Sequence, residues 1–281
     1  MNLAKPKTIH SPNNTTMKPI VPFVLLTVIV ANTTTTAQTT RPWNGKKCAV
    51  VPTYDDALNV HLDNVVPALD AYGFKGTFYL IGSAPVVANR LEEWRTIAKN
   101  GHELGNHTLN HPCDGTLPNR EWVHPEADLS RYSIERAVHE IKMTNTFLRA
   151  IDGKTERTFA YPCVDLNING KPYYNGLEND FVGARGATST YPTAKEVDLN
   201  NINGFVEIST TAQHMIAEIE AAEKAGSFIV FIFHGVGGEH ALNVETAEHQ
   251  KVLDYLHQKQ NDIWVATMVD VANYIKKEQG K

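Results

Sequence analysis

The sequence has few cysteines, no excess of basic residues and no apolar run long enough to cross a bilayer. Its three cysteines, Cys48, Cys113 and Cys163, allow at most one internal disulfide, which excludes a small disulfide-dense scaffold. The net charge of −5 argues against nucleic acid as a partner, because phosphate binding needs clustered basic residues. The glycine-rich phosphate loops that often mark nucleotide-binding folds are also missing.

The longest apolar run, residues 20–31, is typical of a secretory signal. It follows Met17 and Lys18, it is too short to span a membrane, and Thr35 and Ala37 fit the small-residue pattern of a cleavage site. We therefore predict a signal peptide over 1–37, with Met17 as an alternative start. Its removal leaves 23 basic and 31 acidic residues, a net charge of −8, and no stable membrane span. The predicted location is secreted or periplasmic; the alternative is a retained membrane anchor.

Strand-like and helical patterns alternate through the rest of the chain. Strands are predicted over 48–53, 77–81, 102–106, 158–161, 181–184, 228–233 and 263–267. Helices are predicted over 58–72, 91–99, 129–151, 211–224, 244–258 and 271–276. About seven or eight such units favour an α/β fold, a parallel (β/α) barrel that is complete or irregular, with a doubly wound sheet as the alternative. We expect one domain over 44–278, preceded by a short tail at 38–43.

Polar side chains follow several of these strands. Asp55 and Asp56 come at the end of the first, His107 and His111 after the third, and His234 after the run "FIVFIF". The carboxyl ends of parallel strands meet at one edge, so these groups are expected to converge there. Two adjacent carboxylates also need a positive partner if they are buried.

A divalent metal would supply that charge. The four-residue spacing of His107 and His111 would put both side chains on one face of a helical turn. Two imidazoles and one carboxylate form a known type of catalytic zinc site, and cobalt or nickel would suit the same ligands. Thr108 stands where a zinc protease would need glutamate, which disfavours that class. The alternative is that the two histidines are polar caps of a loop.

The two aspartates need different roles. One can ligate the metal while the other takes a proton from the metal-held water. Adjacent carboxylates are unsuited to glycoside hydrolysis, whose two acids stand about 5–10 Å apart. His234 is placed to donate a proton to a leaving group, although a structural role is the alternative.

Four short motifs, "TYDDA", "HTLNH", "FAYPC" and "FIFHGVG", resemble in order those of the NodB-type polysaccharide deacetylase family. The resemblance runs from Cys48 to Ile275 and implies a distorted barrel. It implies metal-assisted hydrolysis of acetyl groups, with Asp55 as the base, His234 as the acid, and Asp56 with His107 and His111 as metal ligands. The family also implies a backbone N–H that binds the oxyanion. Its best match is that of Cys163, in a turn where Tyr161 and Pro162 would face the substrate.

The sequence departs from the family pattern at three places. Ala57 replaces a glycine, and Ala160 stands where an arginine normally orients the base. We predict that Arg185, in "GARG", supplies this guanidinium as a bidentate partner of Asp55; the alternative is a surface arginine. No clear counterpart of the fourth motif exists, so the partner of His234 is not predicted.

The cysteines of "NHPC" and "AYPC" are expected at the same rim. We predict a Cys113–Cys163 disulfide, with free thiols as the alternative, and a buried free thiol at Cys48. A bridge at the rim would pin the metal-bearing loop to the oxyanion turn.

The main hypothesis is a metal-dependent carbohydrate deacetylase that acts on an acetylated polysaccharide or oligosaccharide. One alternative is an O-acetyl xylan esterase with the same site, and another is a sugar-binding protein without activity. Trp122, Tyr173 and Tyr174 lie in long loops and could stack on sugars or simply pack, and His240 is a candidate substrate contact. No protein partner is predicted.

Overall fold

The computed structural model describes residues 1–12 and 41–281. Residues 41–281 belong to one compact unit, and residues 1–12 carry no helix or strand. The apolar run and the cleavage site of the predicted signal peptide lie outside the described residues. Within the described ranges, every helix is too short or too polar to cross a bilayer.

The centre of the compact unit is a parallel sheet in the order β7-β4-β3-β2-β1-β9-β8, with β12 also paired to β1. Its strands are β1 (Cys48–Asp55), β2 (Thr77–Leu80), β3 (Glu103–Asn106), β4 (Phe159–Ala160), β7 (Ala184–Arg185), β8 (Phe205–Val206), β9 (Phe228–Phe233) and β12 (Ile263–Val265). A bridge from Arg185 to Ile202 brings the segment just before β8 beside β7. The sheet is therefore curled, and the predicted distorted barrel is confirmed.

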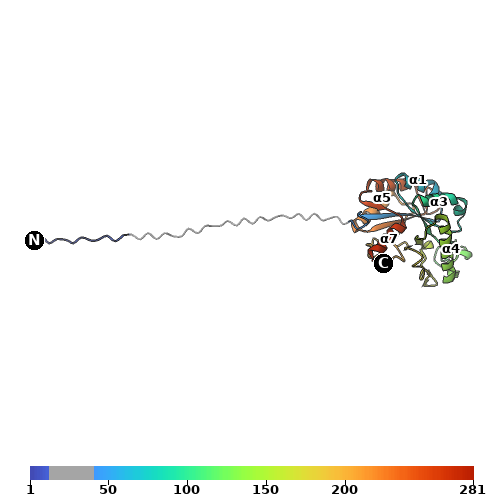
Figure 1. The fold of residues 1–281 in the computed structure, drawn as a ribbon, viewed down its shortest axis with the longest axis horizontal. Helices are drawn as coiled ribbons and strands as arrows, with labels where there is room; N and C mark the ends of the chain where they lie inside the picture. The colour runs from blue at the N-terminus through green and yellow to red at the C-terminus, as the bar shows by residue number, and fades with distance from the viewer. Residues whose placement is uncertain (13–40) are drawn as a thin grey trace. The chain divides into compact units, whose positions relative to one another are not determined.

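Helices surround this sheet, as Figure 1 shows. They are α1 (Val66–Ala71), α2 (Pro85–Asn89), α3 (Leu91–Lys99), α4 (Ile134–Asp152), α5 (Ala212–Ala225), α6 (Thr246–Gln258) and α7 (Met268–Glu278). Helices α4 and α5 end at Gly153 and Gly226, whose φ angles of 73° and 62° suit glycine and close the helix. Two short pairs, β5 (Asn167–Ile168) with β6 (Lys171–Pro172) and β10 (Gly235–Val236) with β11 (Asn243–Val244), lie outside the main sheet.

Strand β9 shows why the sheet needs cover on both faces. All six of its residues are buried. Ile229, Phe231 and Phe233 pack into the core formed with α1, α3, α5 and α6, whereas Phe228 and Val230 pack into the core formed with α7. Each such side chain contributes about 1.5–3 kcal/mol on burial. The unbroken apolar run thus reflects a strand with two buried faces.

The structure differs from prediction at two helices. The helix predicted from residue 129 begins at Ile134, because the side chain of Ser133 accepts a hydrogen bond from the Arg136 amide and caps it. Residues 58–72 are not one regular helix. They contain a π-helical turn, η1 (His61–Val65), before α1 begins.

The compact unit includes part of the predicted N-terminal tail. Trp43 is fully buried, donates from Nε1 to the Gly226 carbonyl at 2.9 Å and packs against Phe228. Arg41 forms an ion pair with Asp262 at 2.9 Å. The folded domain therefore starts earlier than residue 44.

Candidate active site

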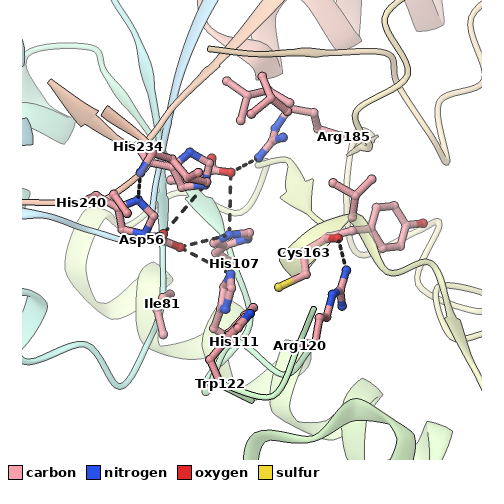
Figure 2. A pocket seen from close by; sticks show the side chains of 17 residues that line it. Asp56, Ile81, His107, His111, Arg120, Trp122, Cys163, Arg185, His234 and His240 are labelled. Atoms are coloured by element: carbon pink, nitrogen blue, oxygen red, sulfur yellow. Dashed lines mark hydrogen bonds and ion pairs between the residues drawn. The ribbon is translucent and has the colours of Figure 1, made fainter. Parts of the chain in front are cut away.

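Five strands bring polar residues at their carboxyl ends to one pocket. Asp55 ends β1, His107 follows β3, Tyr161 follows β4, Arg185 ends β7 and His234 follows β9. The strand register explains the convergence, because Tyr54 of β1 lies opposite both Phe78 of β2 and Phe233 of β9. Asp55 and His234 therefore leave the sheet at the same level. Figure 2 shows His107, Arg185 and His234 pointing toward one another across the pocket.

Asp56, His107 and His111 form the most compact cluster in this pocket. Oδ1 of Asp56 lies 3.5 Å from Nε2 of His107 and 3.5 Å from Nε2 of His111. These separations are too long for hydrogen bonds, and Oδ1 is buried without a hydrogen-bond partner among the described residues. Two ligand atoms on one tetrahedral zinc ion stand about 3.4 Å apart. The three residues therefore fit a divalent metal.

Hydrogen bonding and burial prepare the two imidazoles as ligands. Nδ1 of His107 donates to the carbonyl of Ala160 at 2.9 Å, which leaves the Nε2 lone pair facing Asp56. Burial lowers the pKa of His107 to about 3 and that of His111 to about 4. Both rings are consequently neutral at physiological pH, as a metal ligand must be.

The prediction of a helical turn between the two histidines is wrong. Residues 107–112 form an irregular loop in which Thr108 and His111 have φ angles of 65° and 49°. The hydroxyl of Thr108 accepts from the His111 amide at 2.9 Å and holds the bend. The convergence of the two rings, whose centroids are 4.7 Å apart, comes from this loop and not from a helix face.

Asp55 occupies a different environment from Asp56. Arg185, which is 2% exposed, donates from one guanidinium nitrogen to Oδ2 of Asp55 at 2.5 Å. Burial alone would raise the pKa of Asp55, but Arg185, then His107 and His234, outweigh it and keep that pKa below its usual value. The predicted Arg185–Asp55 pair is present. It is monodentate rather than bidentate, since Oδ1 of Asp55 and Nε of Arg185 have no partner among the described residues.

The second aspartate is less readily ionised. Burial, followed by the neighbouring charge of Asp55, raises the pKa of Asp56. A cation held between Asp56 and the two histidines would offset both effects.

His234 and His240 face Asp56 from the opposite side. Their Nε2 atoms lie 4.0 Å and 3.7 Å from Oδ2 of Asp56, and their rings stack with centroids 5.0 Å apart. Nδ1 of His240 accepts from the Leu242 amide at 3.0 Å. Nδ1 of His234 is buried with no partner in the described chain. The sequence likewise offers no counterpart of the family's fourth motif from which a partner of His234 could be predicted.

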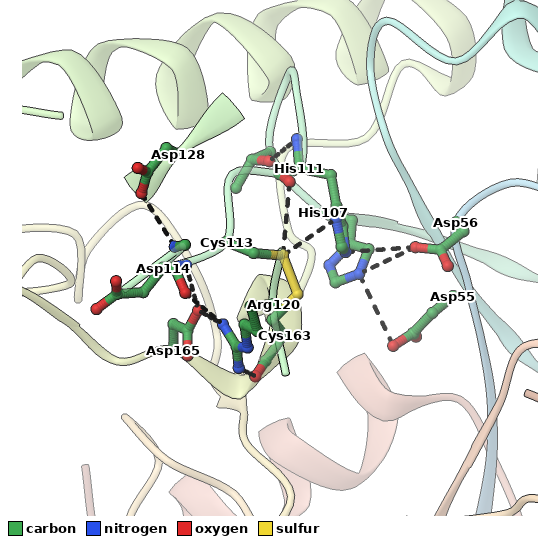
Figure 3. The surroundings of a disulfide bond; sticks show 12 residues. Asp55, Asp56, His107, His111, Cys113, Asp114, Arg120, Asp128, Cys163 and Asp165 are labelled. Atoms are coloured by element: carbon green, nitrogen blue, oxygen red, sulfur yellow. Dashed lines mark hydrogen bonds and ion pairs between the residues drawn. A yellow bond between two sulfur atoms is a disulfide. The ribbon is translucent and has the colours of Figure 1, made fainter. Parts of the chain in front are cut away.

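The predicted disulfide lies beside the metal-ligand cluster, as Figure 3 shows. Cys113 and Cys163 are bonded, with their Cα atoms 5.7 Å apart, and Sγ of Cys113 is 3.6 Å from Nδ1 of His111. Cys48 is a buried free thiol, as predicted. The bridge therefore connects the His111 loop to the turn after β4.

The turn after β4 meets the predictions in part. Cys163 has a φ angle of 51°, and its amide has no acceptor among the described residues, so this N–H is available to a ligand. Tyr161 lines the pocket and donates its hydroxyl to the Asn200 carbonyl at 2.8 Å. Pro162 is buried and does not line the pocket.

The pocket has a volume of about 750 Å³ and an apolar wall that the sequence analysis missed. The wall includes Ile81, Val206, Ile232 and Leu242. The sequence could have indicated Ile81 and Val206 as pocket residues by their position at strand ends. Apolar residues at strand ends are, however, hard to distinguish from core residues in a sequence.

Another missed residue is Arg120. It lines the pocket, pairs with Asp165 and donates to the Cys163 carbonyl at 3.2 Å, which braces the turn.

The aromatic residues of the long loops divide into two groups. Trp122 is 65% exposed and lines the pocket. Tyr173 and Tyr174 are buried, at 1% and 3% exposed, in a core with Phe159. Of these three aromatic residues, Trp122 is therefore the one available to a ligand.

Comparison with known proteins agrees with this fold. The sequence model described as polysaccharide deacetylase matches residues 44–177. The protein YlxY of Bacillus subtilis is 31% identical over 104 residues, and a gellan lyase of a Bacillus species is 31% identical over 110 residues. The matched segments make up 37% and 39% of this chain but only 27% and 4% of those longer proteins.

Solved structures share the fold over most of the chain. A candidate polysaccharide deacetylase from Mycobacterium smegmatis has a TM-score of 0.63 at 17% identity, covering 86% of this chain and 96% of that one. The peptidoglycan deacetylase PdaC of Bacillus subtilis has a TM-score of 0.51 at 17% identity, covering 83% and 94%. An acetyl xylan esterase of Clostridium thermocellum, solved with a cobalt ion, has a TM-score of 0.50 at 21% identity, covering 80% and 90%.

The match to the polysaccharide deacetylase model thus covers a little under half of the chain, the part that contains Asp55, Asp56, His107 and His111.

Proposed function

We propose that this chain is a metal-dependent deacetylase of an acetylated polysaccharide or oligosaccharide. The observation that carries the proposal is the placement of Asp56 Oδ1, unpartnered and buried, 3.5 Å from two neutral imidazoles. Asp56, His107 and His111 would hold a divalent metal, with zinc favoured and cobalt or nickel also suited to these ligands. The bound metal would act as a Lewis acid on the acyl carbonyl and on the attacking water.

Asp55 is proposed as the general base. Its pKa is held below the usual value, so the carboxylate is ionised and can accept the proton of the attacking water. Oδ2 is engaged by Arg185, whereas Oδ1 is free. The proton therefore goes to Oδ1, while Arg185 fixes the orientation of the carboxylate.

The remaining groups suit the other side of the reaction. The free N–H of Cys163 would donate to the oxyanion that develops on the acyl carbonyl. His234 would donate a proton to the leaving nitrogen or oxygen, and His240, stacked on it, would contact the substrate. The exposed ring of Trp122 would pack against a sugar face at the rim.

Export is proposed together with this function. The Cys113–Cys163 bond supports it, because structural disulfides persist in oxidising compartments. Mass spectrometry of the protein recovered from culture fluid or periplasm would test both the location and cleavage after Ala37.

The test of function is acetate release from acetylated xylan and from chitin oligosaccharides, with and without a chelator. Release that stops with chelator and returns with zinc or cobalt supports the proposal, and the preferred polymer distinguishes an O-acetyl esterase from an N-deacetylase. Binding of either polymer without any release by the metal-loaded chain would instead identify a sugar-binding protein.

A further inference from the structure

A buried histidine outside the pocket connects its two sides. His61 is fully buried in η1 and lines no part of the cavity. Its Nδ1 accepts from the Leu58 amide at 3.2 Å, so the ring proton must be on Nε2. Nε2 then donates to the main-chain carbonyl of His234 at 2.8 Å. One side chain thus bonds to the backbone on both sides of the site.

The first side is the turn that follows the two aspartates. Asp56 and Ala57 have φ angles of 79° and 57°, in the left-handed region that residues with a Cβ avoid. Each such residue costs about 1–2 kcal/mol, and neither is glycine. The turn therefore needs external restraint. The Asp56 amide donates to the Tyr79 carbonyl at 3.1 Å. The Leu58 amide, just after the two strained residues, donates to Nδ1 of His61.

The second side is the loop from His234 to His240. Asn64 donates to the Val236 carbonyl at 2.8 Å. The carboxylate of Glu239 accepts from the Asn59 side chain at 2.6 Å and from the Val60 amide at 2.8 Å. These bonds join the same two segments as His61 does. Among these bonds between described residues, that of His61 is the one that reaches the backbone of His234 itself.

We propose that His61 is a positioning residue that fixes His234 relative to the Asp55–Asp56 turn by bonding to the backbone of both. The inference rests on the proposed function, because the base and the acid must stand at a set distance on either side of the acyl group. A displacement of about 1 Å in such an arrangement costs on the order of 100-fold in rate. η1 is also π-helical, and π-helical turns occur often at functional sites.

Three substitutions separate the two bonds. His61→Phe keeps an aromatic ring but leaves the Leu58 amide and the His234 carbonyl without partners. In His61→Gln the terminal amide nitrogen matches Nε2 and can still donate to His234. In His61→Asn the amide oxygen matches Nδ1 and can still accept from Leu58. A positioning role predicts the order Gln above Asn above Phe for kcat, since Gln retains the bond to the acid.

His249 offers a matched control. It is 1% exposed, bonds through Nε2 to the Tyr54 hydroxyl at 2.8 Å and packs on the same aromatic core. Among the described residues it has no hydrogen bond to residues 56–58 or 234–240. His249→Phe should therefore lower the melting temperature about as much as His61→Phe. Its kcat should stay within threefold of that of the unmodified chain.

The experiment measures kcat, KM, metal content and melting temperature of the zinc-loaded chain and these variants. NMR additionally gives the exchange rate of the Leu58 amide and the carbonyl ¹³C shift of His234. We expect His61→Phe to lose about 100-fold in kcat with KM within threefold and full metal content. The Leu58 amide should exchange faster, the His234 carbonyl shift should move, and His61→Gln should recover at least tenfold in kcat.

Three results would overturn the inference. They are a wild-type kcat in His61→Phe, equal losses of kcat in His61→Phe and His249→Phe, and unchanged NMR signals at Leu58 and His234. If the unmodified chain releases no acetate, the proposed function fails. The exchange of Leu58 and the carbonyl shift of His234 then decide by themselves whether His61 holds the two segments together.

Discussion

At the scale of single residues, two neighbouring carboxylates have opposite electrostatic environments. The pKa of Asp55 lies below its usual value because Arg185, together with His107 and His234, outweighs the effect of burial, whereas the pKa of Asp56 is raised by burial and by Asp55. Such divergence between adjacent groups is typical of acids with separate roles. It supports the proposal that Asp55, which pairs with the guanidinium, is the base and that Asp56, which lies among the imidazoles, is a metal ligand.

Replacement of Arg185 tests this division. Arg185→Met leaves Asp55 buried without its ion pair, which is expected to destabilise the protein by about 3–5 kcal/mol and to lower kcat at least tenfold. Arg157→Met is the control, since Arg157 is also 2% exposed and pairs with Asp152 far from the pocket. The control should lose stability in urea unfolding but keep kcat. Equal losses of kcat in both variants would refute the role of Arg185.

The sequence was informative about these residues for a physical reason. Polar groups at the ends of apolar strands must meet at one edge, so Asp55, His107 and His234 could be placed before the structure was known. The path of the loop between His107 and His111 could not, because it depends on left-handed φ angles at two residues that rarely adopt them. The two rings were expected to lie close together, but this was attributed to a helical turn, whereas the structure has an irregular loop.

At the scale of elements, the disulfide joins the loop after β3 to the turn after β4. The two cysteines are 50 residues apart, and bridging a loop of that length stabilises a protein by about 2–4 kcal/mol. The bridge also ties the loop that carries His111 to the turn that contains Cys163. We therefore expect it to serve both stability and catalysis.

The double variant Cys113→Ala, Cys163→Ala should lose about 2–4 kcal/mol of unfolding free energy and bind metal more weakly. A reductant should lower the melting temperature of the unmodified chain but not that of the variant. Cys48→Ala is the control, since that thiol is buried and unbridged. An unchanged metal affinity in the double variant would show that the bridge does not hold His111.

Helix ends were predicted well where a glycine follows them. The helix predicted to end at residue 224 ends at Ala225, because Gly226 tolerates the positive φ that closes it. The π-helical turn η1 was not predicted. Tertiary contacts explain this turn, since Asn59, His61 and Asn64 form hydrogen bonds to the loop over residues 234–239.

At the scale of the whole molecule, buried neutral histidines link stability to pH. Burial lowers the pKa of His61 and of His249 to about 4, whereas an unfolded histidine titrates near pH 6.5. Between these values the unfolded chain binds more protons than the folded one. Stability from each ring is therefore complete above about pH 6.5 and falls as the pH drops toward 4.

Urea unfolding at pH 7.5, 6.0 and 5.0 measures this dependence. Each ring contributes up to about 1.4 kcal/mol per pH unit below pH 6.5, so His249→Phe should flatten the slope by that amount. The comparison with the variant is needed because burial raises the pKa of Glu207 to about 7, which acts in the opposite direction. An identical slope in chain and variant would contradict the assignment of a neutral buried ring.

The overall architecture was predictable because alternation of strands and helices leaves few ways to bury both faces of a parallel sheet. The central strand β9 is apolar throughout, which already implied cover on both sides. The apolar wall of the pocket was not predictable, since Val206 and Ile232 come together only when β8 and β9 pair.

The account as a whole depends on Asp56 and the two histidines gathering a metal ion for a reaction in which Asp55 takes the proton. The most direct test is the metal content and acetate release of Asp55→Asn and Asp56→Asn, purified side by side. We predict that Asp55→Asn keeps its metal and loses turnover, whereas Asp56→Asn loses both. Equal metal content in the two variants, or turnover in Asp55→Asn near that of the unmodified chain, would contradict it.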